Sequence, residues 1–213
     1  MDGLCVFCAD IGSVKAGNFG WAASNVNGQP LESGSDIRDF AQRLVTHLDS
    51  GRPAAVGFEC PLFVPLREDP RRLTEARTGD GSRAWSAGAG TGALATGLVE
   101  VCWILNEVRR GLTREVRSHL DWNSFVSEGG LFLWEAFVSG GAKPRGEENP
   151  HAADAMVAVD AFIGALPDPT SMNAIQETDV ISLVGMSMLR TGWTHDVRSL
   201  EAPCLVIKPS AQR

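Results

Sequence analysis

The sequence is short of positive charge. Its 213 residues include 19 Lys and Arg against 26 Asp and Glu, which gives a formal net charge of -7 at pH 7. Proteins that coat nucleic acid through bulk electrostatic attraction have the opposite balance, so this class is excluded, whereas a local basic groove is not. Any nucleic-acid role must therefore depend on local features of the chain.

The chain also lacks long apolar runs and paired cysteines. No run approaches the roughly 20 residues of a membrane span, and the N-terminus lacks the basic flank of a signal peptide. The five cysteines are odd in number and lie mostly inside apolar segments, as reduced core thiols do. Cys5 and Cys8 have CxxC spacing, but residues three apart on a strand face opposite sides of a sheet, so no shared zinc is expected. We expect a soluble, cytoplasmic protein without a membrane partner, and its oligomeric state stays open.

Apolar runs alternate with helical periodicities in an order typical of α/β proteins. Strands are predicted at residues 4–10, 17–24, 27–33, 53–61, 131–137 and 204–208, and helices at 35–51, 93–110, 151–166 and 179–189, with a short helix within 111–130. The first three strands are expected to form an antiparallel meander, because Asn27-Gly28 is a turn signal. The length favours a single domain over residues 1–213, with a core at about 3–165 and a C-terminal helix-strand extension at about 171–213.

Residues 66–92 form a long excursion with little periodicity, and excursions of this length are usually functional or mobile. Their arginines could contact a nucleic-acid backbone, but neighbouring acids offset the charge, so a solvated mixed-charge loop is the simpler interpretation. Trp85 could stack on a base or pack against the protein. The GAGTG segment at 88–92 predicts a flexible hinge that could touch phosphate.

Three apolar strands end in an acid, namely Asp10, Glu59 and Glu135, and a fourth acid, Asp154, follows His151 in the next helix. The carboxyl ends of neighbouring parallel strands lie along one sheet edge, so we expect these side chains to converge. Clustered carboxylates are unfavourable unless protons or cations neutralise them, and hard divalent cations prefer oxygen ligands. The pattern therefore predicts a site for Mg²⁺ or Mn²⁺.

Structural alternatives exist for the strand acids. Asp10 could simply start the turn that follows its strand. Glu59 could pair with an arginine of residues 67–83, and Glu135 could pair with Lys143 or Arg145.

The helix residues have structural alternatives as well. Asp154 could be favoured in a first turn by the helix macrodipole, and His151 could be only a polar surface residue. Asp160, about 120° from Asp154 around the helix, is expected to be a structural partner.

The order of three strands, helix, strand, helix, strand and helix resembles the RNase H-like superfamily, in particular its branch of predicted RNase H-like nucleases. The segments that carry the resemblance are DIGSVKAGNFGWAAS, VGFECPL, LFLWEAF and HAADAMVAVDAFI, within about residues 3–165. It implies an α/β fold with a mixed five-stranded sheet, in which three antiparallel strands are followed by parallel strands, flanked by helices.

By this resemblance Asp10 would bridge two magnesium ions, and Glu59 and Glu135 would supply the acids of the fourth and fifth strands. Asp154 with His151 would correspond to the acids, or the His-acid pair, at the start of this helix in Holliday-junction-resolvase-type members. The leading hypothesis is a Mg²⁺- or Mn²⁺-dependent nuclease that hydrolyses DNA or RNA with these four acids as catalytic ligands and His151 as an auxiliary.

Two other functions stay open. DIGS followed by a glycine-bearing hairpin also resembles the phosphate loop of actin-like ATPases and sugar kinases, although those enzymes need two such domains around the nucleotide. A non-catalytic protein could keep the fold and use residues 66–92 to bind a partner, because a fold does not fix a function.

Overall fold

The computed structural model describes residues 3–27, 29–81, 83–138 and 149–209. Its strands are β1 (Cys5–Asp10), β2 (Gly20–Asn25), β3 (Pro30–Gly34), β4 (Ala54–Glu59), β5 (Phe63–Pro65), β6 (Ser118–His119), β7 (Leu131–Ala136), β8 (Val180–Ser182) and β9 (Leu205–Ile207). Its α-helices are α1 (Ile37–Asp49), α2 (Gly88–Gly111), α3 (Trp122–Glu128), α4 (Pro150–Gly164) and α5 (Leu183–Arg190). Short 3-10 helices are η1 (Val14–Ala16), η2 (Pro70–Arg72), η3 (Pro169–Met172) and η4 (Val197–Glu201).

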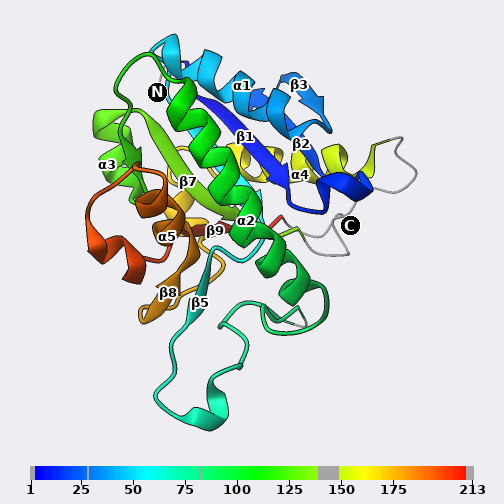
Figure 1. Ribbon diagram of the computed structural model, residues 1–213, viewed down its shortest axis with the longest axis vertical. Helices are drawn as coiled ribbons and strands as arrows, with labels where there is room; N and C mark the ends of the chain where they lie inside the picture. The colour runs from blue at the N-terminus through cyan, green and yellow to red at the C-terminus, as the bar shows by residue number, and fades with distance from the viewer. Residues whose placement is uncertain (1–2, 28, 82, 139–148, 210–213) are drawn as a thin grey trace.

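One mixed sheet organises the molecule (Figure 1). Its strand order is β3-β2-β1-β4-β7-β6, and β9 also pairs with β7. β2 runs antiparallel to its neighbours β1 and β3, whereas β4, β7, β6 and β9 continue the sheet in parallel with β1. The α/β class and the change from antiparallel to parallel strands are thus confirmed. The prediction of five strands is wrong, because β6 pairs with the first residues of β7 and β9 pairs with the last, giving seven strands.

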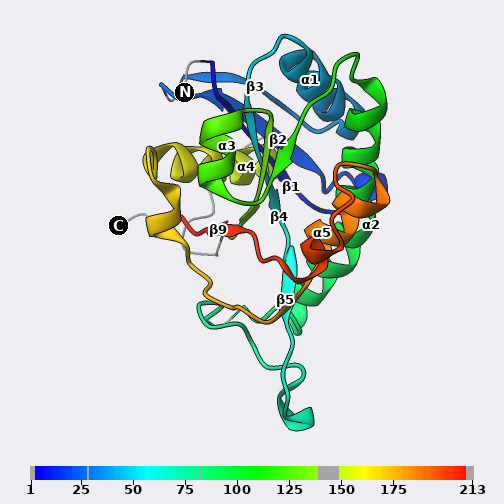
Figure 2. The ribbon, with the colours of Figure 1, turned by 90° about the vertical axis from the view of Figure 1, so that its left-hand side faces the viewer.

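Helices cover both faces of this sheet, as Figure 2 shows, with α1 and α2 on one side and α3 and α4 on the other. Successive residues of a strand point to opposite faces, so each strand contributes to two cores. Cys5 lies in the core under α1 and α2, and Cys8 lies in the core under α3 and α4. The two cysteines therefore face opposite sides of the sheet, as expected from their spacing.

Two helices begin elsewhere than expected. The predicted hinge at 88–92 is instead the start of α2, and the chain before α5 forms β8, which pairs with β5 in a small second sheet. By length and composition alone α2 is long and apolar enough to cross a membrane, contrary to the expectation from the sequence. One such helix is weak evidence for a membrane, and α2 packs against α1 and α5.

The excursion beyond β5 projects past the end of the sheet (Figure 1). Its charged side chains largely pair with one another, as in the ion pairs Arg71–Asp69 and Arg72–Glu75. Arg67 also reaches Glu177, in the segment before β8, through two hydrogen bonds of 2.8 Å. The expectation of a mixed-charge loop is confirmed for these residues, and the segment is tied to the body of the protein as well.

Candidate metal centre

Two acids stand side by side at the carboxyl ends of adjacent strands. Asp10 is the last residue of β1 and Glu59 is the last residue of β4, and the parallel register pairs them directly. Paired residues in a sheet share a face, and here it is the face covered by α4. The apolar runs that precede both acids therefore bury the strands and place the two carboxylates together at one edge.

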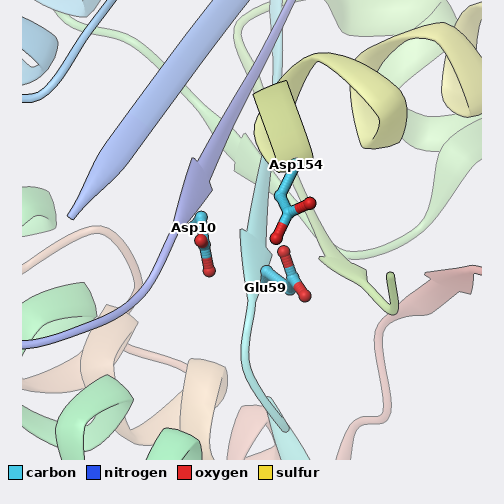
Figure 3. A group of neighbouring side chains, drawn as sticks. All are labelled: Asp10, Glu59 and Asp154. Atoms are coloured by element: carbon cyan, nitrogen blue, oxygen red, sulfur yellow. The ribbon is translucent and has the colours of Figure 1, made fainter. Parts of the chain in front are cut away.

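The third acid comes from α4. Asn149 accepts a hydrogen bond from the Ala152 amide as N-cap, and Pro150 occupies the first turn, as the sequence predicts. No acid lies in that first turn, so Asp154 is too far along the helix for the macrodipole to account for its position. Its side chain points instead at the ends of β1 and β4 (Figure 3).

A close approach between α4 and β2 makes this possible. Gly20 pairs with Asp10 in the sheet, and a Cβ atom at Gly20 would lie 2.4 Å from the backbone of His151 and Ala152. The lack of a side chain at Gly20 lets the amino end of α4 rest directly on the strand. His151 and Asp154 are thereby brought to the sheet edge where β1 ends at Asp10.

The three carboxylates form a compact cluster. One oxygen each of Asp10, Glu59 and Asp154 lies within 4.8 Å of the others. Asp10 is 7% and Asp154 5% exposed, and Glu59 is partly buried. Like charges at this separation repel each other strongly where water is scarce, so a cation is favoured there. This carboxylate triad could hold a metal ion, as predicted for three of the four acids.

His151 lies beside the triad and contacts Asp10. Its Nδ1 lies 2.6 Å from the Asp10 Oδ2, and its side chain is about one-third exposed. The ring therefore contacts the carboxylate that the sequence singled out first. The turn after β1 is capped by Ser13, whose side chain accepts a hydrogen bond from the Ala16 amide.

Glu135 does not join the triad. The register aligns it with Phe58 and not with Glu59, so its side chain lies on the sheet face covered by α1 and α2. There its carboxylate, with the residue only 1% exposed, accepts hydrogen bonds of 2.6 and 2.8 Å from the Arg77 guanidinium and one of 2.8 Å from the Leu62 amide. The prediction that Glu135 joins the other acids is not supported by this geometry, and a salt bridge explains the residue instead.

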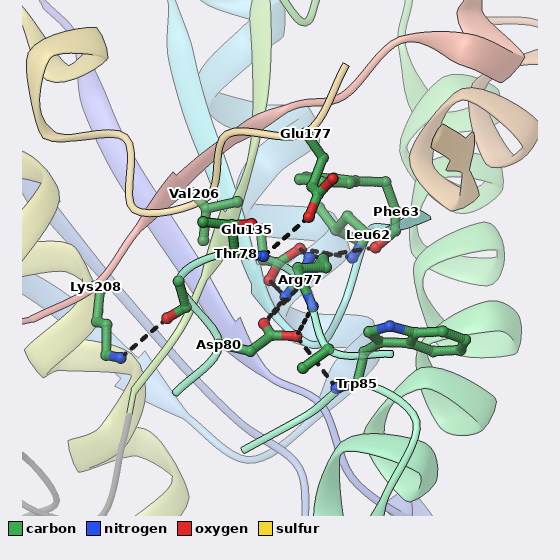
Figure 4. Close-up of polar contacts among 12 residues, drawn as sticks. Leu62, Phe63, Arg77, Thr78, Asp80, Trp85, Glu135, Glu177, Val206 and Lys208 are labelled. Atoms are coloured by element: carbon green, nitrogen blue, oxygen red, sulfur yellow. Dashed lines mark hydrogen bonds and ion pairs between the residues drawn. The ribbon is translucent and has the colours of Figure 1, made fainter. Parts of the chain in front are cut away.

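The partner in this salt bridge comes from the excursion (Figure 4). Arg77 also bonds Asp80 and the Phe63 carbonyl, and both Arg77 and Asp80 are almost fully buried. Burial alone would lower the pKa of Arg77, but Glu135 and then Asp80 raise it overall, so the group stays charged. An arginine of residues 67–83 thus pairs with a strand-end glutamate, and this glutamate is Glu135. Lys143 and Arg145, the partners considered for Glu135, lie outside the described residues.

Glu100 is a further acid near the triad, and the sequence did not single it out. Partial burial, opposed by the Val14 and Gly12 backbone groups and reinforced by the charge of Asp10, raises the pKa of Glu100 to about 7. It is the only acid within the apolar segment ALATGLVEVCWIL, and this isolation was the available signal. Asp160, by contrast, lies exposed on α4 away from the triad.

A cavity of about 340 Å³ adjoins the triad. Asp10 and Glu59 line one part of it, and the rest is formed by the chain after β4, the amino end of α2, the end of β7 and arginines of the excursion. Cys60 also lines the cavity, but burial raises the pKa of its thiol well above the usual value, so it is not a nucleophile. Trp85 is not part of the wall, and its indole N–H donates to the Glu75 carbonyl.

Comparison of the chain with protein-family models, with curated proteins and with solved structures gives no match.

Proposed function

We propose that the protein is a divalent-metal-dependent nuclease that hydrolyses phosphodiester bonds of DNA or RNA. The observation that carries the proposal is the triad of Asp10, Glu59 and Asp154, drawn from two adjacent strand ends and a helix, with oxygens within 4.8 Å. An all-oxygen set of ligands suits Mg²⁺ or Mn²⁺, whereas zinc sites are usually built with His and Cys. The further residue His151 would orient Asp10 through its 2.6 Å contact.

The sheet supports an RNase H-like fold for this nuclease. A meander ordered β3-β2-β1, followed by parallel β4 and β7, is the strand order that the resemblance implies. β6 and β9 are additions at the β7 edge. The triad occupies the end of the first strand, the end of the fourth and the following helix, where that superfamily keeps its acids.

The proposed reaction is hydrolysis with water as the nucleophile. A water oxygen forms a bond to phosphorus, the bond from phosphorus to the leaving oxygen breaks, and the leaving oxygen gains a proton. Bound divalent ions would lower the pKa of the water and neutralise charge on the phosphate. The chain contributes by fixing the three carboxylates on packed elements, which holds the ligands in place without a loop.

The metal site is tested first, by calorimetric titration of Mg²⁺ and Mn²⁺. Wild type should bind saturably, and Asp154→Asn should weaken binding more than about 100-fold, since even outer-shell changes at metal sites cost 10–100-fold. Asp160→Asn is the matched control, because Asp160 lies on the same helix, is exposed, and is outside the triad. Equal loss in both variants would remove the triad as the site.

Cleavage is tested next with labelled DNA and RNA in the presence of Mg²⁺ or Mn²⁺. We expect hydrolysis by wild type and none by Asp10→Asn, with an unchanged circular dichroism spectrum. Cleavage that survives in a pure Asp10→Asn preparation contradicts the assignment. Metal binding without cleavage of any DNA or RNA contradicts the nuclease function but not the site.

A further inference from the structure

Resting on the proposed function, we infer that the cavity beside the triad receives one unpaired nucleotide, so that the substrate is single-stranded or carries an extruded nucleotide at the point of cleavage. The scissile phosphate would lie at Asp10 and Glu59, and the neighbouring nucleotide would enter the cavity that these two residues help to line.

The size of the cavity carries the first step. Its volume of about 340 Å³ lies at the lower end of small-molecule sites, which span roughly 300–1,000 Å³. This volume suits one nucleotide but not a base pair still stacked in a duplex. A base that enters such a site must leave its stack, which costs least when the base is already unpaired.

The chemistry of the wall carries the second step. Ile11 and Pro61 line the cavity on one side, and Ala136, Phe137 and Val138 line it at the end of β7. Apolar and aromatic surfaces of this kind bind the faces of unstacked bases. A wall built only for a free phosphate would instead be dominated by polar donors.

Charge at the cavity fits a nucleotide as well. Arg77 and Glu135 both line the wall, but they neutralise each other in a buried salt bridge. Arg83 is exposed at the same cavity and forms no ion pair with the residues that the structure describes. It leaves one positive charge for the phosphate that links the bound nucleotide to the next.

A substitution can fill this cavity without touching the triad. A Cβ atom at Gly92, in α2, would meet no atom within 4 Å, and Gly92 lines the cavity. Gly92→Leu should therefore occupy part of the space, and leucine is a better helix former than glycine. The matched control is Gly164→Leu, because Gly164 is also helical, also has no atom within 4 Å of a Cβ, and lies outside this cavity.

The test measures binding of a fluorescent single-stranded oligonucleotide, and of the same strand annealed to its complement, with Ca²⁺ in place of Mg²⁺ to prevent hydrolysis. We expect wild type to prefer the single strand at least about fivefold, which is the lower limit of what stacking of one base contributes to affinity. Gly92→Leu should lose this preference, and Gly164→Leu should keep it. A second variant, Ala89→Leu, should act as Gly92→Leu does, because Ala89 lines the same wall.

Two results would overturn the inference. The first is equal affinity of wild type for single and double strands, and the second is a preference that survives in both cavity variants. Calorimetry with Mg²⁺ separates these results from failure of the proposed function: Gly92→Leu should still bind the ion as wild type does. Failure of wild type to bind the ion, or to cleave any DNA or RNA, would instead contradict the proposed nuclease function.

Discussion

Replacing Arg77 with methionine should destabilise the protein substantially. The change keeps an unbranched apolar side chain but removes the guanidinium that pairs with Glu135 at 2.6 Å and with Asp80 at 3.0 Å. Both acids are at most 2% exposed and would remain buried without this partner. Breaking a buried pair in this way costs about 3–5 kcal/mol.

A loss of about 4 kcal/mol is a large share of the 5–15 kcal/mol that typically stabilises a folded domain. For a chain of this length it lowers the melting temperature by about 8–16 °C. Urea denaturation followed by tryptophan fluorescence gives the free energy of unfolding. The matched control is Arg71→Met in the same excursion, whose side chain is 89% exposed and pairs with Asp69. A surface pair of this kind contributes about 0–1 kcal/mol.

Glu135→Gln and the double variant complete the cycle. If Arg77 and Glu135 stabilise each other, the double variant should lose less than the sum of the single losses, by about 0.5–3 kcal/mol. Glu135→Gln should also bind Mg²⁺ as wild type does, because Glu135 lies on the opposite sheet face from the triad. An Arg77→Met loss no larger than that of Arg71→Met would refute the energetic reasoning, and loss of Mg²⁺ binding in Glu135→Gln would refute the placement of Glu135.

Two further predictions concern neighbours of the triad. Glu100 binds its proton more tightly in the folded state, with a pKa of about 7 against an ordinary 4.5, so its own contribution to stability should be fully present below pH 4.5 and should fall as the pH rises through 7. Glu100→Gln should remove this fall and stabilise the protein at pH 8 by about 1 kcal/mol, after discounting for solvent screening. Urea denaturation at several pH values measures the effect. A dependence of stability on pH that is the same in the variant and in wild type would contradict this role of Glu100. Gly20→Ala should push α4 away from β2 and weaken Mg²⁺ binding in calorimetry. Gly164→Ala should not, because a Cβ atom at Gly164 has no atom within 4 Å. Equal Mg²⁺ affinities of the two variants would show that the contact at Gly20 does not position the triad.

Much of the sheet could be predicted because its signals are local. Near-continuous apolar runs mark β1, β4 and β7 as buried strands, and the Asn149-Pro150 pair marks the start of α4. Convergence of the triad followed from topology, since parallel strands end at one edge. The strand predicted at 204–208 is present as β9, whereas β6 was not predicted, because it is only two residues long and pairs with only part of β7.

The role of Glu135 could not be predicted, because it depends on register. A shift of one residue moves a side chain to the other sheet face, and no local signal in LFLWEAF indicates whether Glu135 aligns with Phe58 or with Glu59. The partner Arg77 lies 58 positions away in a segment without periodicity, so its contact with Glu135 has no sequence signature. The sequence predicts too late a start for α2, because the glycines at 88, 90 and 92 oppose helix formation locally, although the helix in fact includes them.

The two strand-end glutamates have different roles at this sheet edge. Glu59 shares a face with Asp10 and Asp154 and belongs to the triad, whereas Glu135, on the next strand, anchors the excursion through Arg77. The anchored segment carries Arg83 to the cavity that Asp10 and Glu59 line. One edge thus holds both the carboxylates proposed to bind the metal and the salt bridge that fixes a wall of the cavity beside them. Loss of the salt bridge should therefore lower the affinity for the single strand more than it lowers the affinity for the metal ion.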